Sequence, residues 1–253
     1  MKQMSEEALA KVPEVTLLFW IMKITATTLG ETGGDAVSMS MNLGYLVGTV
    51  IFAVIFLITA GAQIKAKRFH PSLYWVTIIA TTTVGTTLAD FADRSLGIGY
   101  AGGATILFVL LMACLAVWHW SLGSVSVQSV SSPKAEMFYW VTIMFSQTLG
   151  TALGDWTADS AGFGYAGGVI LFCVLLAVVA GAYFWTRFSR TMLFWAAFIL
   201  TRPLGAVVGD LLDKPIGSGG LAMSRYTASA ALALFIVVLI LVFRQQPARG
   251  RGH

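Results

Sequence analysis

Eight apolar stretches follow one another along the chain, and each has about the 20 residues that a helix needs to cross a bilayer. The intervening segments are shorter and carry Gly, Ser, Pro and charged residues. This pattern predicts an all-α integral membrane protein with eight transmembrane helices. The stretches cover roughly residues 15–37, 43–64, 72–93, 99–122, 137–158, 164–186, 191–212 and 221–243.

The four odd-numbered stretches repeat one another. In each of them an aromatic-Trp pair precedes an Asp, with the Trp 15 residues and a Gly five residues before it. The even stretches also begin alike, with Gly-Tyr at 44–45, GYAGG at 99–103 and 164–168, and GSGG at 217–220 as a degenerate fourth copy. We therefore expect four helical hairpins that cross the membrane in the same sense, as parallel repeats. The aspartates are Asp35, Asp90, Asp155 and Asp210, and the tryptophans are Trp20, Trp75, Trp140 and Trp195.

The aspartates are spaced by 55, 65 and 55 residues, so the chain also divides into two halves that are offset by 120 residues. We expect residues 1–122 to form a first four-helix half and residues 135–253 a second one. The segment 123–134, with the sequence GSVSVQSVSSPK, is the linker between them.

Composition excludes several classes of protein. Hydrophobic residues make up 57% of the chain and charged residues only 11%, far fewer than the roughly 25% of a soluble domain. A soluble enzyme, a disordered protein and a nucleic-acid binder are therefore not expected. The chain also contains no HExxH, Walker A or GxSxG motif, so we expect neither an enzyme nor a cofactor. Cys114 and Cys173 stand singly in apolar stretches and are interpreted as packing residues.

The distribution of Lys and Arg predicts the orientation of the chain. Eleven of them fall in the termini and in the loops after the even stretches, against only Arg94 and Lys214 in the opposite loops. The positive-inside rule then places both termini in the cytoplasm. The four tryptophans would form an aromatic belt at the inner interface, and each Asp would lie about 22 Å further along its helix, near the outer surface.

Acidic and hydroxyl side chains mark the odd stretches as the place of a site. Glu31 lies one helical turn before Asp35, and the equivalent positions of the other repeats carry further polar residues, which form one stripe per helix. Lipid cannot satisfy such stripes, so we expect them to converge on a central polar cavity. The alternative is that each Asp only caps a helix or meets water, and that Gly and Thr serve close packing alone.

This cavity is predicted to bind a divalent cation, because hard oxygen ligands suit Mg, Ca or Mn. The predicted metal ligands are Glu31, Asp35, Asp90, Asp155 and Asp210, and the predicted additional substrate-binding residues are Thr28, Thr83 and Thr148. Two bases near mid-span, Lys23 and Arg202, are expected to pair with the carboxylates and to act as exchangeable counter-ions that gate the site. A permanent structural ion pair is the alternative.

Several motifs resemble a widespread family of bacterial multi-pass inner-membrane proteins of unassigned function. They are VPEVTLLFWIMKITATTLGET at 12–32, LYWVT at 73–77, FYWVT with TLGTALGD, and LTRPLGAVVGDLLDKP at 200–215. The resemblance extends over essentially the whole chain. It implies a location in the bacterial inner membrane and no particular substrate.

The functional expectation is a secondary transporter that exports a divalent cation, such as manganese, in exchange for protons. The alternatives are a passive cation channel with pseudo-fourfold hairpins and a membrane scaffold or sensor without transport. The expected partners are the divalent cation, protons and membrane lipid, without nucleic acid, and a homo-oligomer stays open as an option.

Overall fold

The structure is a computed structural model that describes residues 10–248, and in this range it consists of helices and their connections. Three of the terminal bases on which the predicted orientation depends lie outside the described residues, namely Lys2, Arg249 and Arg251. The eight long helices are α1 (Leu17–Asp35), α2 (Tyr45–Lys65), α3 (Pro71–Asp90), α4 (Tyr100–Leu122), α5 (Pro133–Asp155), α6 (Gly164–Trp185), α7 (Arg190–Asp213) and α8 (Arg225–Val242).

Local signals set where the helices begin and end. Thr16, Ser132 and Ser189 accept a hydrogen bond at the starts of α1, α5 and α7, which satisfies an otherwise unpaired backbone N–H. After α1, α3 and α5 the chain continues through a π-helical turn, so the aspartates stand where the helix widens. These turns are η1 (Ala36–Ser40), η2 (Phe91–Ser95) and η4 (Trp156–Ser160), and short 3₁₀ turns are η3 (Val127–Ser129) and η5 (Ile216–Ser218).

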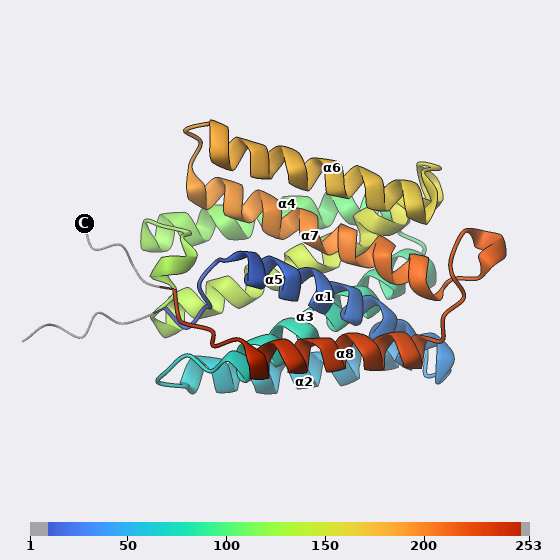
Figure 1. Cartoon of the computed structure of the whole chain (residues 1–253), viewed down its shortest axis with the longest axis horizontal. Coiled ribbons are helices and arrows are strands. Elements are labelled where there is room, and N and C mark those ends of the chain that lie inside the picture. Colours follow the sequence, from blue (N-terminus) through green and yellow to red (C-terminus); the bar gives the residue numbers. More distant parts are fainter. Residues whose placement is uncertain (1–9, 249–253) are drawn as a thin grey trace, which may run out of the picture.

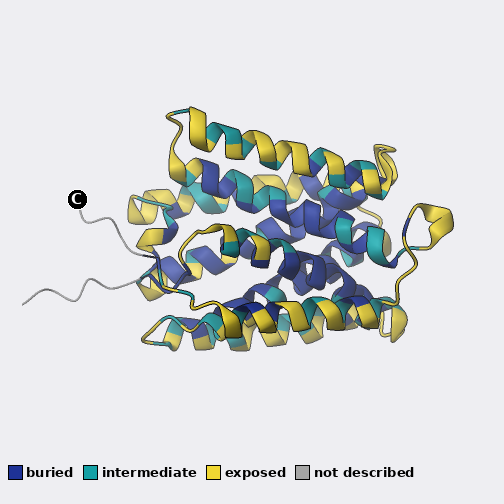
Figure 2. Ribbon diagram, in the orientation of Figure 1, coloured by how far each residue is buried: buried dark blue, intermediate teal, exposed yellow. Residues whose placement is uncertain are grey.

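The odd-numbered helices form a closed inner ring in the order α1, α3, α5, α7 and back to α1. The even-numbered helices lie around this ring, and their residues are mostly exposed while those of the ring are mostly buried (Figure 1, Figure 2). Polar stripes and glycines are thus inside, and Leu, Ile, Val and Phe side chains are outside. Because the polar stripes lie on the odd-numbered stretches and the even ones are almost uniformly apolar, the sequence predicts an inner ring of odd helices with the even helices outside, and this prediction is confirmed.

The packing unit is out of phase with the sequence repeat. Each outer helix packs on the inner helix of the following repeat, in the pairs α2 with α3, α4 with α5 and α6 with α7, and α1 and α2 do not form a packed hairpin. Loop length accounts for two of these pairs, because segments 66–70 and 186–189 are shorter than 36–44 and 91–99, whereas α4 and α5 pack together across the longer segment 123–132. Short connections favour antiparallel neighbours. The expected hairpins within each repeat are therefore wrong in their packing, although the helices themselves are as predicted.

The two ends of the chain close the ring. Helix α8 is the outer helix of the last repeat, and it packs on α1, the inner helix of the first repeat. Beside them the terminal segments pair through their backbones, with Glu14 N donating to Gln246 O at 2.9 Å and Ala248 N donating to Val12 O at 2.8 Å. The first and last repeats therefore meet as directly as consecutive ones do.

Within residues 10–248, five helices are long and apolar enough to cross a membrane, namely α2, α4, α6, α7 and α8. The outer helices among them expose large apolar side chains along their length, including Leu57, Ile170 and Leu241. Exposed apolar surface of this extent is typical of a protein that meets lipid. Helices α1, α3 and α5, which are also predicted to span, carry polar stripes on their buried faces and are not among these five.

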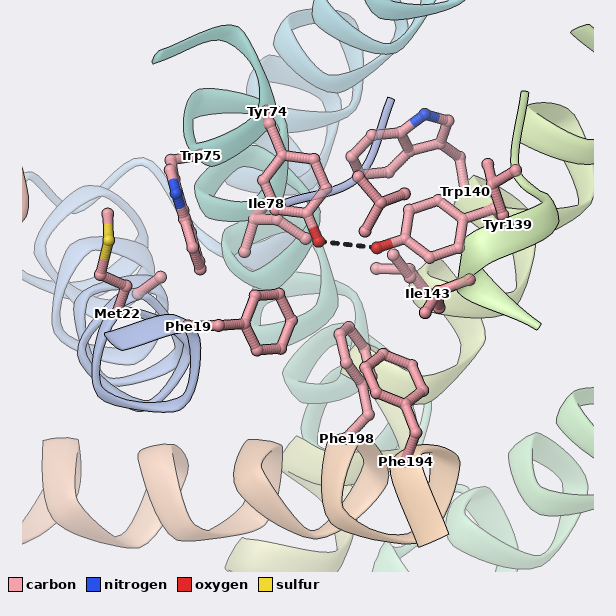
Figure 3. Packing of buried hydrophobic residues seen from close by; sticks show 14 of the residues in the cluster. Phe19, Met22, Tyr74, Trp75, Ile78, Tyr139, Trp140, Ile143, Phe194 and Phe198 are labelled. Carbon is pink, nitrogen blue, oxygen red and sulfur yellow. Dashed lines mark hydrogen bonds between the residues drawn. The ribbon is translucent and has the colours of Figure 1, made fainter. Parts of the chain in front are cut away.

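The ring is filled by aromatic side chains at the end opposite the aspartates. Figure 3 shows Tyr74 and Tyr139 facing each other, with a hydrogen bond of 2.6 Å between their hydroxyls, above Phe19 and Phe194. The predicted aromatic belt is wrong for Trp75, Trp140 and Trp195, which are at most 5% exposed and belong to this cluster. Burial and mutual packing of large aromatic side chains stabilise them inside the ring.

Candidate functional site

The four repeated aspartates lie at the same end of the bundle, on the right in Figure 1. Asp35, Asp90 and Asp155 are the last residues of α1, α3 and α5, and Asp210 lies in the last turn of α7. All four are buried, with at most 3% of each residue exposed. Glu31, one turn deeper on α1, is also 3% exposed. Charged groups in such an environment need partners, because burial removes the solvation by water. The partners define the site.

Glycines allow the inner helices to approach each other closely enough for this convergence. Each repeated Gly of the ring packs against one residue of the next inner helix. That residue always stands eight positions before the Asp of its own repeat. A Cβ on Gly85, for example, would lie only 2.9 Å from the backbone of Gln147. The Gly and its neighbour are Gly30 with Thr82, Gly85 with Gln147, Gly150 with Arg202, and Gly205 with Thr27.

Two bases bridge neighbouring aspartates across the ring. The Arg94 guanidinium lies 2.8 Å from Asp90 and 3.4 Å from Asp155. Lys214 Nζ lies 2.8 Å from Asp35 and 3.0 Å from Asp210. Each base therefore joins the Asp of its own repeat to the Asp of the next helix.

Lys214 follows α7 directly, and its environment keeps it charged. Burial lowers the pKa of its ammonium, but the negative charges of Asp210 and Asp35 outweigh burial, so that the pKa is raised overall. Arg225, at the start of α8, completes this side of the site. Its Nε lies 2.8 Å from Asp213 and 3.6 Å from Asp35.

Three buried carboxylates converge in the site: Asp155 from the Arg94 ion pairs, Asp210 from the Lys214 ion pairs, and Glu31. One oxygen each of Glu31, Asp155 and Asp210 lies within 4.8 Å of the others. Oxygens bound to opposite sides of a Ca²⁺ ion are up to about 5 Å apart, so this spacing fits a common cation. Asp35, Asp210 and Asp213 form a second group with the same spacing. Asp90 belongs to neither group and faces Arg94 instead.

Arg202 fills the axis of the ring just below these carboxylates. It is fully buried, and its Nη2 donates to Glu31 Oε2 at 3.0 Å and to the hydroxyls of Thr86 and Thr151. One side chain of α7 thus contacts all three other inner helices. The centre of the expected polar cavity is occupied by a guanidinium.

The other predicted site residues lie deeper or bond within their own helix. The Lys23 ammonium is fully buried, 3.4 Å from Gln147 Oε1 and 4.2 Å from the centroid of the Phe198 ring, and the described residues give it no ion pair. Each of three predicted hydroxyls donates to a carbonyl one turn back on its own helix, at 2.7–3.0 Å. They belong to Thr28, Thr83 and Thr148.

Six residues of this site are absent from the predicted ligands and counter-ions, although two of them, Thr86 and Thr151, lie on the predicted polar stripes. Arg94 and Lys214 were counted only as loop charges, although their offset of 120 residues matches that of the two halves. Thr86 and Thr151 occupy the position of Glu31 in their repeats, and that equivalence was the signal for them. Asp213 and Arg225 are brought together only by the path of the chain after α7.

Comparison with known proteins identifies the repeat but assigns no activity. No curated protein and no solved structure matches the chain. The model of a family described as a Repeat of Unknown Function (DUF347) matches four times, at residues 18–69, 73–124, 138–189 and 193–247. Each match spans one inner helix and the outer helix that follows it. The chain therefore belongs to the family of proteins that are built from this repeat.

Proposed function

We propose that this protein is a secondary transporter of the bacterial inner membrane that exports a divalent cation, such as manganese, in exchange for protons. All eight long helices would span the bilayer, with the termini in the cytoplasm and the carboxylate end toward the outside. The observation that carries the proposal is the convergence of Glu31, Asp155 and Asp210, with oxygens within 4.8 Å of one another inside a closed helical ring.

The charge balance of the ion-pair network supports a divalent substrate. The pairs on the carboxylate side join six carboxylates to four bases. With all groups charged, two negative charges are left over inside the bundle. Because uncompensated buried charge is costly, the network needs two positive charges, which one divalent cation or two protons can supply equally well. Exchange of one for the other would keep the site neutral.

The ring is closed below the site, which supports a carrier over a channel. Arg202 crosses the axis, and the aromatic cluster around Tyr74 and Tyr139 fills the opposite end. A passive channel would need a continuous path for ions through both layers. A carrier needs access from only one side at a time.

Purified protein in proteoliposomes tests the proposal. The vesicles hold a manganese-quenched dye and an acidic interior, so that proton exit drives uptake of external Mn²⁺. We expect uptake to depend on the pH gradient and to fall at least tenfold in Glu31→Gln and in Asp155→Asn. The matched control is Asp159→Asn, which changes an exposed acid one turn from Asp155 and should keep most of the uptake.

Other results would reject the transporter. Mn²⁺ flux of equal size without a pH gradient would indicate a channel. Absence of flux from folded protein would indicate a scaffold or sensor. Uptake that the two site variants leave unchanged would place the cation elsewhere.

A further inference from the structure

The contacts of Arg202 have the form of an ion-binding site rather than of an ordinary ion pair. Oxygens of Glu31, Thr86 and Thr151, from three different helices, all contact the same nitrogen, Nη2. This nitrogen carries two N–H groups for three acceptors. The three oxygens therefore surround it as ligands surround a small cation. We call this set of three oxygens the axial cradle.

The axial cradle follows from the internal repeat. Glu31, Thr86 and Thr151 stand four residues before the Asp of their repeats, and the fourth equivalent position is Ala206. The one repeat that lacks an oxygen at this position supplies Arg202 instead, one turn earlier. At the position of Arg202 the other repeats carry Thr27, Thr82 and Gln147, which are all uncharged.

Only one of the three guanidinium nitrogens of Arg202 makes hydrogen bonds among the described residues. A structural arginine typically binds a carboxylate with two parallel hydrogen bonds. Here Nε and Nη1 are buried without a hydrogen-bond partner among the described residues, and so is the hydroxyl of Thr82, one turn below Thr86. Buried polar groups that lack partners are rare and call for an explanation. Of these three groups, the Thr82 hydroxyl offers an oxygen that can contact a cation.

We propose that the axial cradle is a binding site for a small monovalent cation and that Arg202 is its tethered competitor. One carboxylate and two neutral hydroxyls carry a single negative charge, which a monovalent ion balances. Their hard oxygens favour an alkali ion such as Na⁺. The proposal goes beyond the divalent site above, because it concerns a deeper position and a different ion.

The variant Arg202→Gln tests the axial cradle, because Gln147 shows that Gln fits this position in another repeat. Unfolding temperature in detergent is measured in NaCl and in choline chloride at equal ionic strength, since choline is too large for the cradle. We expect Na⁺ at about ten times its Kd to raise the unfolding temperature of Arg202→Gln by about 3–6 °C. The parent protein should show a much smaller Na⁺-specific shift, because Arg202 occupies the cradle.

Two further variants define the outcome. In Glu31→Gln/Arg202→Gln the charge of the cradle is gone, so the Na⁺-specific shift should disappear. In Lys23→Met/Arg202→Gln the other fully buried base among the described residues is also gone, so the shift should persist or grow. The proposal is wrong if Na⁺ stabilises neither Arg202→Gln nor Lys23→Met/Arg202→Gln. This includes the case in which neither variant folds in either salt. None of these measurements involves Mn²⁺ flux, so a failure of the transport proposal stays distinguishable.

Discussion

Arg94 and Lys214 stand 120 residues apart, and each places its charge between the Asp of its own repeat and the Asp of the next inner helix. The equivalent positions of the other two repeats hold Met39 and Asp159. The backbone ring thus has four similar helices, whereas the charges follow a twofold pattern. This pattern gives the site two similar sides, with Glu31 between them.

Loss of the Lys214 bridge should destabilise the protein strongly. Lys214→Met leaves Asp35 and Asp210 without their shared base, and removal of one partner from a buried pair costs about 3–5 kcal/mol. The matched control is Lys134→Met, which changes an exposed Lys and should stay within about 0.5 kcal/mol. Free energies of unfolding in detergent, measured with denaturant, check the difference.

The pH dependence of this bridge follows from the raised pKa of Lys214. A Lys whose pKa is higher in the folded state contributes stability that is complete below the unfolded value of about 10.4. This stability is lost only as the pH rises through the higher folded value. The penalty of Lys214→Met should therefore persist at pH 9. A penalty that vanishes between pH 7.5 and 9 would contradict the assignment.

Close packing of the ring makes a single methyl group costly at its glycines. Gly85→Ala would place a Cβ 2.9 Å from the Gln147 backbone, which cannot move aside as a side chain can. We expect a loss of about 1–3 kcal/mol. Gly33→Ala on α1 is the control, because its nearest neighbour is 3.9 Å away and Ala favours a helix over Gly by roughly 0.5–1 kcal/mol. The unfolding temperature should therefore fall in Gly85→Ala and rise in Gly33→Ala.

The hydroxyl pair of Tyr74 and Tyr139 should behave as one unit. Tyr74→Phe leaves the buried hydroxyl of Tyr139 without its 2.6 Å partner, at a cost of about 1–3 kcal/mol. Tyr74→Phe/Tyr139→Phe removes both hydroxyls from an aromatic environment and should recover most of that loss. A double-mutant cycle measures the coupling. Additive losses would show that the two hydroxyls do not depend on each other.

Lys11 is expected to anchor the N-terminal segment. Its Nζ lies 2.6 Å from Glu136 and donates to the carbonyls of Gln63, Ile64 and Ala66 at the end of α2. Lys11→Met leaves the buried Glu136 unpaired and should cost about 3–5 kcal/mol.

Restoring neutrality should rescue this variant. We expect Lys11→Met/Glu136→Gln to unfold closer to the parent than Lys11→Met does, as measured by thermal unfolding in detergent. A double variant that is no more stable than the single one would show that the contacts of Lys11 with the α2 carbonyls, rather than its charge, dominate.

The sequence by itself determined the helices and the internal repeat. Apolar stretches of about 20 residues form helices wherever they pack, and the regular spacing of Asp35, Asp90, Asp155 and Asp210 places equivalent side chains at equivalent depths. Polar stripes on the odd helices and uniformly apolar even helices were enough to predict which helices form the ring. These properties depend on the order of residues along one helix.

Only the tertiary structure decided how the helices pair and what each charge contacts. Loop length, more than repeat order, sets α2 against α3, and closure of the ring brings Glu31 of the first repeat to Arg202 of the last. Contacts between residues 171 positions apart depend on side chains that meet across helices. Spacing along one helix carries no information about contacts between helices. The bridging role of Arg94 and the central position of Arg202 therefore depend on the arrangement of the four inner helices in the ring.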